Sequence, residues 1–122
     1  MPGVGTTRQV SMIGISADET RGLIFDATQF PYVTAYVVST GTTSSGVVSF
    51  EEADYPEKDI PYTGTWSDLG SSYDVTVSAI SGGGQEAVHF PVSKFRYVRP
   101  FIETAIGGGG SIAVVFVGTG PS

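Results

Sequence analysis

The chain has 122 residues, 17 glycines, no cysteine and a formal net charge of -6. This length suits one domain with a core of its own, and the lack of cysteine excludes disulfides, thiolate nucleophiles and cysteine-bound zinc. Six Lys and Arg residues against twelve Asp and Glu residues argue against a nucleic-acid partner, because such binding relies on cations that neutralise phosphates.

Residues 1–8 are predicted to form an N-terminal arm, since their Gly, Pro and Thr content favours no regular element. No apolar run approaches the roughly 20 residues that span a bilayer, and the first residues lack an apolar signal core. We therefore expect synthesis in the cytoplasm and no membrane partner. Residues 9–15 alternate as a strand, residues 17–19 turn, and residues 23–25 resume extended structure.

Residues 32–40, YVTAYVVST, carry a strong strand signal because they are dense in β-branched and aromatic side chains. The turn sequence GTTSSG follows and leads into residues 47–52. In that strand Val48 and Phe50 should point inward, while Ser49 and Glu51 face outward. We predict that these two strands pair as a hairpin.

Residues 53–73 form a long excursion with prolines, glycines and clustered acids. Long connections in compact domains tend to be functional or disordered, and the aromatic residues favour order. The candidate aromatic anchors are Tyr55, Tyr62, Trp66 and Tyr73. They could form a platform for sugar rings, or Trp66 could plug one end of the domain and anchor the loop.

Acidic residues gather in the same region and raise the question of a metal or a catalytic pair. They are Glu51, Glu52, Asp54, Glu57 and Asp59, with Asp68 and Asp74 beyond. Their spacing matches no calcium loop, and so small a domain has little room for the cleft across which glycosidase carboxylates face each other. A solvated acidic loop is the expectation, with no metal and no cofactor.

Residues 74–80 predict another strand, and residues 85–118 organise the rest of the fold. Their three apolar runs are separated by Ser93 and Lys94 and then by the glycines at 107–110, which predicts a three-strand meander with a flexible hairpin tip. In the last run Ile112, Val114 and Phe116 lie on one face, and Ala113, Val115 and Val117 lie on the other. A sheet that is apolar on both faces needs a second sheet on one side and a further cover, such as another protein chain, on the other.

These elements predict an all-β fold, a two-sheet antiparallel β-sandwich of jelly-roll or Greek-key type with about eight strands over residues 9–118 and a tail at 119–122. No catalytic motif is present. His89 lies in an apolar run without a local nucleophile or acid, so we expect a structural role. The glycine run lacks the Lys and the helix of a phosphate site. We predict that the chain is not an enzyme.

Basic and aromatic residues alternate between 94 and 101, where Lys94, Arg96 and Arg99 alternate with aromatic rings. Arg beside aromatic residues is typical of interface hot spots, although Arg96 could instead pair with the acidic loop. With the arm included, the candidate interface residues are Val4, Thr6, Arg8, Arg96, Arg99 and Phe101.

The order of four segments resembles a group of small β-sandwich virion proteins of tailed bacteriophages, some of which are head decoration or cement proteins. The segments are VVSFEEADYPEKD, TGTWSDL, FPVSKFRYVRPFIET and GGSIAVVFVG. The likeness covers residues 23–118, and its most specific parts are residues 66–69 and 97–99. Residues 55–62 lengthen the loop before the Trp segment relative to that group.

This resemblance implies a non-enzymatic shell component on the capsid exterior, assembled in the host cytoplasm. It would bind the major capsid protein as a homotrimer or other homo-oligomer, and we expect residues 1–7 to lie across a capsid subunit with Arg96 and Arg99 at a subunit boundary. Two alternatives remain. One is a carbohydrate-binding module of a phage fibre that binds glycan through Trp66, and the other is a neck or tail subunit with the same fold.

Overall fold

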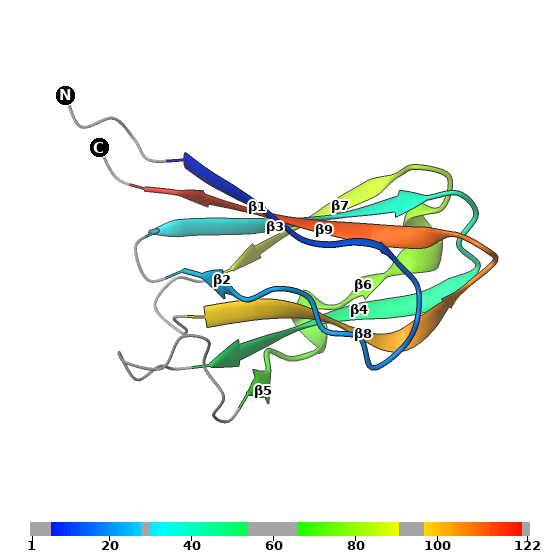
Figure 1. The fold of residues 1–122 in the computed structure, drawn as a ribbon, viewed down its shortest axis with the longest axis horizontal. Coiled ribbons are helices and arrows are strands. Elements are labelled where there is room, and N and C mark those ends of the chain that lie inside the picture. The colour runs from blue at the N-terminus through cyan, green and yellow to red at the C-terminus, as the bar shows by residue number, and fades with distance from the viewer. Residues whose placement is uncertain (1–5, 28–29, 54–65, 91–96, 121–122) are drawn as a thin grey trace.

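The computed structural model describes residues 6–27, 30–53, 66–90 and 97–120, and it contains two antiparallel sheets packed face to face (Figure 1). The four-stranded sheet has, in order, β1 (Thr6–Ile15), β9 (Ser111–Thr119), β3 (Tyr32–Thr40) and β7 (Gln85–Phe90). The five-stranded sheet has β2 (Phe25–Asp26), β8 (Tyr97–Gly107), β4 (Ser45–Ala53) and β5 (Ser67–Asp68), and β6 (Val75–Thr76) also pairs with β4. The predicted all-β sandwich is confirmed.

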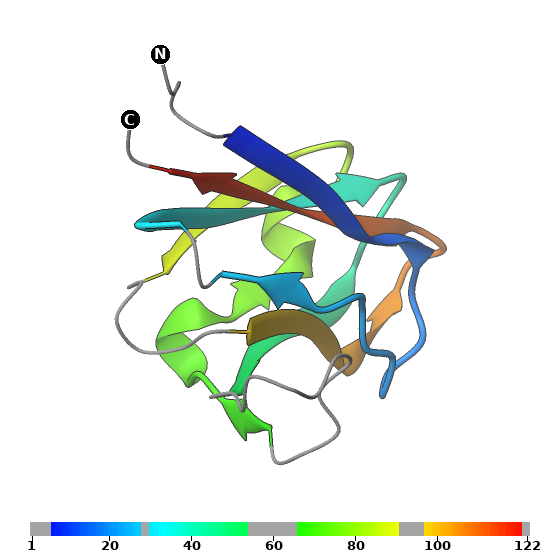
Figure 2. The same cartoon turned by 60° about the vertical axis from the view of Figure 1, so that its left-hand side comes forward.

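The strand order is that of a jelly roll, because the chain changes sheet at nearly every connection. It crosses between β1 and β2, β2 and β3, β3 and β4, β6 and β7, β7 and β8, and β8 and β9. Figure 2 shows the two layers from the side, with the short 3-10 helices η1 (Ser71–Tyr73) and η2 (Val77–Ile80) between β5 and β7. Within the ranges given above, no helix is long and apolar enough to cross a membrane.

Two predicted strand pairings are wrong. β3 pairs with β7 and β9, whereas β4 pairs with β5, β6 and β8, so β3 and β4 lie in different sheets and form no hairpin. Residues 85–118 form no meander, because β7 and β9 flank β3 while β8 lies in the opposite sheet. An apolar inner face satisfies either arrangement, so alternation could not decide between a hairpin and a crossing.

The predicted strand at residues 74–80 is mostly a 3-10 helix. Val75 and Val77 are buried two positions apart, as in a strand, but the next buried residue is Ile80, three positions on. That last step fits the three-residue turn of a 3-10 helix.

The glycine run at residues 107–110 is not a hairpin tip, because it joins β8 to β9 across the two sheets. A Cβ at Gly110 would lie 2.5 Å from the carbonyl oxygen of Thr42, so glycine allows this close contact.

The core lies between the inner faces and centres on Phe116. Its ring centroid lies 5.1 Å from that of Phe25, 5.9 Å from that of Phe50 and 6.1 Å from that of Phe90. These rings come from both sheets and all four are buried. Since burying one large apolar side chain stabilises a fold by about 1.5–3 kcal/mol, this cluster contributes strongly to holding the sheets together.

The N-terminal arm and the C-terminal tail are both shorter than predicted, because β1 begins at Thr6 and β9 ends at Thr119. β1 begins at Thr6, which pairs with Thr119 of β9, so residues 6–8 belong to the sheet and not to an arm. Residues 1–5 and 121–122 lie outside the described residues. The pairing places the start of β1 and the end of β9 side by side.

Candidate assembly surfaces

The outer face of the four-stranded sheet, which we call the open face, carries mostly uncharged side chains. Directly paired residues of neighbouring strands point to the same side of a sheet, so the register assigns its members. They are Thr6, Arg8 and Val10 of β1, Ala113, Val115, Val117 and Thr119 of β9, Tyr32, Thr34, Tyr36 and Val38 of β3, and Gln85, Ala87 and His89 of β7. Two complete rows run across the sheet, one through Val10, Val115, Tyr36 and Ala87 and the other through Arg8, Val117, Thr34 and His89.

The apolar residues of the open face are accessible. Tyr32 is 71% and Val10 is 43% exposed, and the central residues Tyr36, Val115 and Val117 are half-buried by their neighbours in the sheet. None of the members assigned above is an acid, and Arg8 is the member that carries a full charge at neutral pH. None of the acids behind the chain's net charge of -6 is therefore a described member of this face.

His89 lies on the open face and not in an apolar strand interior. Its side chain is exposed, and its Nδ1 atom lies 3.0 Å from Oγ1 of Thr34. Its neighbours Val88 and Phe90 point into the core. The Thr34 hydroxyl is its neighbour on the face as assigned, and no acid lies there to orient the imidazole.

The outer face of the five-stranded sheet carries a different arrangement, which we call the arginine cluster: Arg21, Glu51, Trp66, Arg99 and Phe101. Nε of Arg99 lies 2.8 Å and Nε of Arg21 lies 3.2 Å from the same Glu51 carboxylate oxygen. The Arg99 guanidinium lies 4.0 Å from the Trp66 ring centroid, and that of Arg21 lies 4.3 Å from the Phe101 ring centroid. Two cations, one anion and two rings thus cover part of this face.

Backbone hydrogen bonds bring Arg21 to the cluster. The amide of Ile102 donates to the carbonyl of Thr20, and the amide of Gly22 donates to the carbonyl of Pro100, each at 2.9 Å. The segment before β2 therefore runs along the edge of β8. A Cβ at Gly22 would lie 2.5 Å from the Ser11 carbonyl oxygen, so glycine permits this close passage. Sequence reasoning missed Arg21 because it lies 30 positions from Glu51.

The outward side of β4 is less solvated than predicted. The Glu51 side chain is only 12% exposed, and Ser49, also predicted to face out, is fully buried. Ser49 donates a hydrogen bond to the Glu103 carboxylate. The outward direction of both residues is correct, but neighbouring side chains cover them.

The Asp74 carboxyl group lies near Ser49 and Glu103. Burial raises the pKa of its carboxyl, a hydrogen bond with Ser49 opposes the rise, and the nearby charges of Glu103 and Asp68 add to it. Its Oδ1 atom is buried and makes no hydrogen bond. The Ser49 hydroxyl has one proton, so it cannot donate to Asp74 while it donates to Glu103.

The remaining acids make no metal site in the described ranges, where no three His or acidic side chains converge. The predicted loop acids Asp54, Glu57 and Asp59 lie outside those ranges.

The described aromatic anchors contact different parts of the molecule. Trp66 is half-buried against Arg99 on the outer face of the five-stranded sheet. Tyr73 stacks on Phe90 of the core, with ring centroids 5.7 Å apart. Trp66 therefore packs on an outer face and does not plug the end of the sandwich, whereas Tyr73 packs on the core. Tyr55 and Tyr62 lie outside the described residues.

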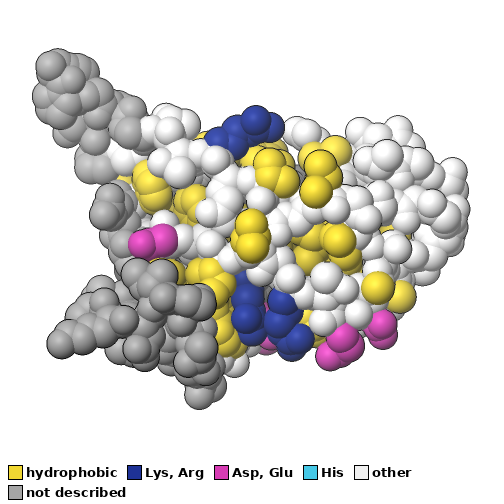
Figure 3. All heavy atoms as spheres, viewed as in Figure 1, with side chains coloured by type: hydrophobic (Ala, Val, Ile, Leu, Met, Phe, Trp, Pro, Cys, Tyr) yellow, Lys and Arg dark blue, Asp and Glu magenta, His cyan; other side chains and the backbone are white. Residues whose placement is uncertain are grey.

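A cavity of about 290 Å³, which we call the edge groove, runs beside β1. Its lining includes Val10, Ile13 and Leu23, which are 43%, 72% and 65% exposed, and Arg21 also reaches it. The Leu23 amide donates to the Ser11 carbonyl at 2.8 Å and fixes the far wall. β1 is irregular here, with register shifts on either side of Met12 and a positive φ at Gly14. Figure 3 shows hydrophobic side chains on this side of the molecule between two groups of basic side chains.

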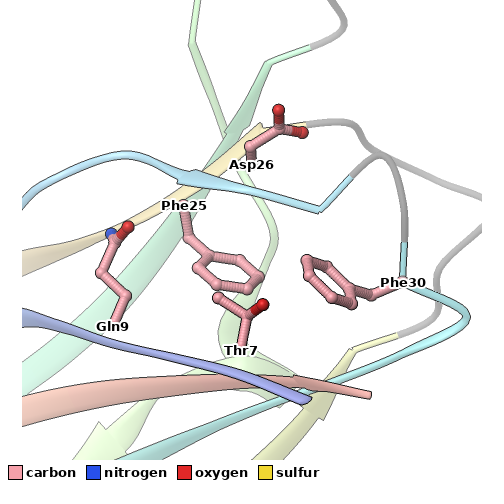
Figure 4. A pocket seen from close by; sticks show the side chains of 5 residues that line it. All are labelled: Thr7, Gln9, Phe25, Asp26 and Phe30. Atoms are coloured by element: carbon pink, nitrogen blue, oxygen red, sulfur yellow. The ribbon is translucent and has the colours of Figure 1, made fainter. Parts of the chain in front are cut away.

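A second cavity, of about 200 Å³, opens between β1 and β2 and is lined by Thr7, Gln9, Phe25, Asp26 and Phe30 (Figure 4). The Gln9 amide group donates to the Ile24 carbonyl at 3.0 Å and to Ser11 Oγ at 2.9 Å, so the fold already uses it. Phe30 stacks on Phe25, and it lies where a Cβ at Gly118 would come within 2.6 Å of its ring. The stacked rings of Phe25 and Phe30 therefore close the edge of the core at this cavity.

The predicted interface residues are thus divided between two faces. Thr6 and Arg8 lie on the open face, while Arg99 and Phe101 belong to the arginine cluster. Val4 and Arg96 lie outside the described residues. Sequence reasoning missed Ile13 and Leu23 as exposed residues, because a regular strand period does not reveal the irregular path of β1.

No protein-family model and no curated protein matches the sequence. Among solved structures, the chain is similar to the crystal structure of SPBc2 prophage-derived protein YomS, with a TM-score of 0.63 and 14% sequence identity. The match covers 98% of this chain and 96% of that chain. It shows that the two proteins share one fold over nearly their whole lengths.

Proposed function

We propose that the chain is a non-enzymatic structural protein of a bacteriophage particle, of the head decoration type. The observation that carries the proposal is the exposed apolar surface that continues from the open face through Val10 into the edge groove. A soluble monomer rarely leaves so much contiguous apolar surface uncovered, and such patches mark sites of protein contact. The fold shared with a prophage-derived protein supports a phage origin.

The edge groove is the proposed contact with the major capsid protein. Its volume of about 290 Å³ suits one large apolar side chain of a partner. Ile13 and Leu23 would lie on either side of that side chain, and Arg21 would supply a cation at the rim. A buried apolar anchor beside an arginine is the usual composition of an interface hot spot.

Cementing would follow from selective binding. A subunit that binds only the assembled lattice stabilises that state by mass action, as any ligand specific for one state does. Each copy contributes modestly, and several linked contacts add avidity. The virion exterior is the expected location.

Copy number in the virion tests this function. Quantitative mass spectrometry of purified particles from the phage that encodes the chain should find hundreds of copies, and imaging should place them on the head. A few copies would support the neck, tail or fibre alternatives, and absence from the particle would contradict all of these structural roles.

The role of the groove has its own test. Replacing both Ile13 and Leu23 with Asp should abolish occupancy on purified heads, because two charges would then lie against the partner's apolar anchor. Thr104→Asp is the matched control, since Thr104 is exposed on β8 of the other sheet. Unchanged occupancy of the double variant would rule out the groove as the contact.

A further inference from the structure

We propose that the open face binds the open face of a second copy, so that the assembling unit is a two-fold dimer with its four-stranded sheets packed together. The proposal deepens the function above by naming the contact between copies. The dimer rests on the proposed function in one respect, because a structural role in a particle implies that copies of the chain associate.

Charge is the first argument for a second copy. Two chains of net charge -6 repel each other, so they can associate only where their approaching surfaces lack acids. The described carboxylates that are exposed, Asp18, Glu19, Asp26, Asp68, Glu86 and Glu103, all lie off the open face as the register assigns it. An acidic or strongly basic partner would find no matching set of charges there, whereas an identical surface, which lacks acids and carries Arg8 at its edge, is matched.

Shape is the second argument. Paired sheets pack face to face at a distance of about 10 Å when small and large apolar side chains alternate. The open face has that pattern, with Tyr36 between Ala87 and Val115 along one row and between Thr34 and Val38 along β3. Its inner counterpart already packs on another sheet in this way.

Area is the third argument. Three strands of nine or ten residues and one of six make a face of roughly 19 by 28 Å, or about 530 Å². A specific interface buries about 600–1,000 Å² on each partner. The open face therefore comes close to the lower limit by itself, and its side chains and border add to it.

A two-fold contact also keeps the arginines apart. Arg8 lies on the edge strand β1, in the row that ends with His89 on the opposite edge strand β7. A two-fold axis parallel to the strands places β1 over the partner's β7, and an axis across the strands reverses the order of the rows. Neither arrangement places Arg8 of one copy against Arg8 of the other.

Sedimentation equilibrium of the purified full-length chain tests the proposal. We expect a monomer–dimer equilibrium between about 1 and 100 µM. Val115→Glu should raise the dissociation constant at least about 100-fold, because the two-fold axis brings two buried charges together at the centre of the interface. Val10→Glu, at a more exposed edge position, should act in the same direction and by about 10-fold.

Thr104→Glu is the control, since it adds the same charge on the other sheet. It should leave the dissociation constant unchanged, and circular dichroism with urea unfolding should show all three variants folded. A monomeric wild-type chain over the whole range, a trimer, or equal effects of Val10→Glu and Thr104→Glu would each overturn the proposal.

Failure of this proposal and failure of the proposed function are distinguishable. The dimer is measured on the isolated chain, whereas head binding is measured by occupancy and depends on the edge groove. A stable dimer that is absent from virions contradicts only the function. A monomer that occupies heads contradicts only the dimer.

Discussion

The two outer faces of this sandwich begin from the same sequence pattern and end differently. In both sheets the central strands carry apolar or aromatic residues on their outward side, such as Val115 on β9 and Phe101 on β8. On the five-stranded sheet, arginines cover the rings and share one carboxylate. On the four-stranded sheet no such cluster is described, and the apolar face stays open.

The difference shows that outward apolar residues do not by themselves mark an interface. Phe101 and Trp66 are covered from within the chain because the segment before β2 brings Arg21 to β8 and because Arg99 lies directly opposite Glu51. Val115 and Tyr36 have only uncharged cross-strand neighbours. The open face is therefore the better candidate for assembly, and four predictions test the comparison.

The largest expected loss of stability comes from a substitution on the inner side of β9, and a substitution on its outer side should cost much less. Phe116→Ala should lower the free energy of unfolding by about 3–5 kcal/mol, because Phe116 is fully buried among three other rings. The neighbouring Val115→Ala, on the open face, should cost less than about 1 kcal/mol under conditions in which the chain is monomeric. Urea unfolding measures both, and equal losses would show that the open face is part of the folding core.

Glu51 should be the most sensitive member of the arginine cluster. Glu51→Ala should lower the free energy of unfolding by about 2–3 kcal/mol, since it leaves two guanidinium groups close together without their anion. Glu86→Ala, which removes an exposed acid on β7, is the control and should change stability by less than about 0.5 kcal/mol. A loss below that level for Glu51→Ala would mean that the cluster does not stabilise its face.

Trp66→Ala should cost about 1 kcal/mol through the lost stacking on Arg99. Tyr32→Ala, which removes a ring that is 71% exposed on the open face, should be nearly neutral in the monomer. Thermal or urea unfolding can compare them. If Tyr32 proved as costly as Trp66, the two outer faces would be equally integrated with the fold.

The smallest effect concerns pH. Burial raises the pKa of Asp74 in the folded chain above its value of 3.8, so between the two pKa values the folded chain binds more protons than the unfolded chain. The charged carboxylate therefore weakens the fold at neutral pH, and this penalty disappears as the pH falls through the raised pKa.

Asp74→Asn should consequently raise the free energy of unfolding at pH 7, by less than about 1 kcal/mol because the group is partly solvated. The difference between the variant and the wild type should shrink as the pH falls toward about 4. Urea unfolding across this range measures it. A difference that stays constant with pH would contradict the assigned cause.

Much of the fold could be predicted from the sequence, because strand periodicity and β-branched content are local signals. They were sufficient for the two-sheet sandwich and for the inward direction of Val48 and Phe50. The partner of each strand could not be predicted, since β3 and β4 are consecutive in the chain yet lie in different sheets. Alternation records which face is buried and carries no information on which neighbour supplies the hydrogen bonds.

The candidate surfaces were less predictable for the same reason. Arg99 and Phe101 formed a convincing local pattern, but their contacts with Glu51 and Arg21 join segments far apart in the sequence. The exposure of Ile13 and Leu23 follows from the irregular path of β1 beside the segment before β2. The doubly apolar pattern of β9 pointed to the open face, and the predicted interface residues Thr6 and Arg8 also lie on it.

Hydroxyl-radical footprinting of the assembled chain tests the central claim most directly, because Tyr36 reports on the open face and Trp66 on the arginine cluster. On going from a dilute monomer to the assembled state, oxidation of Tyr36 should fall several-fold while oxidation of Trp66 stays the same. Protection of Trp66 with Tyr36 unchanged would contradict the account, since assembly would then use the face that the chain already covers.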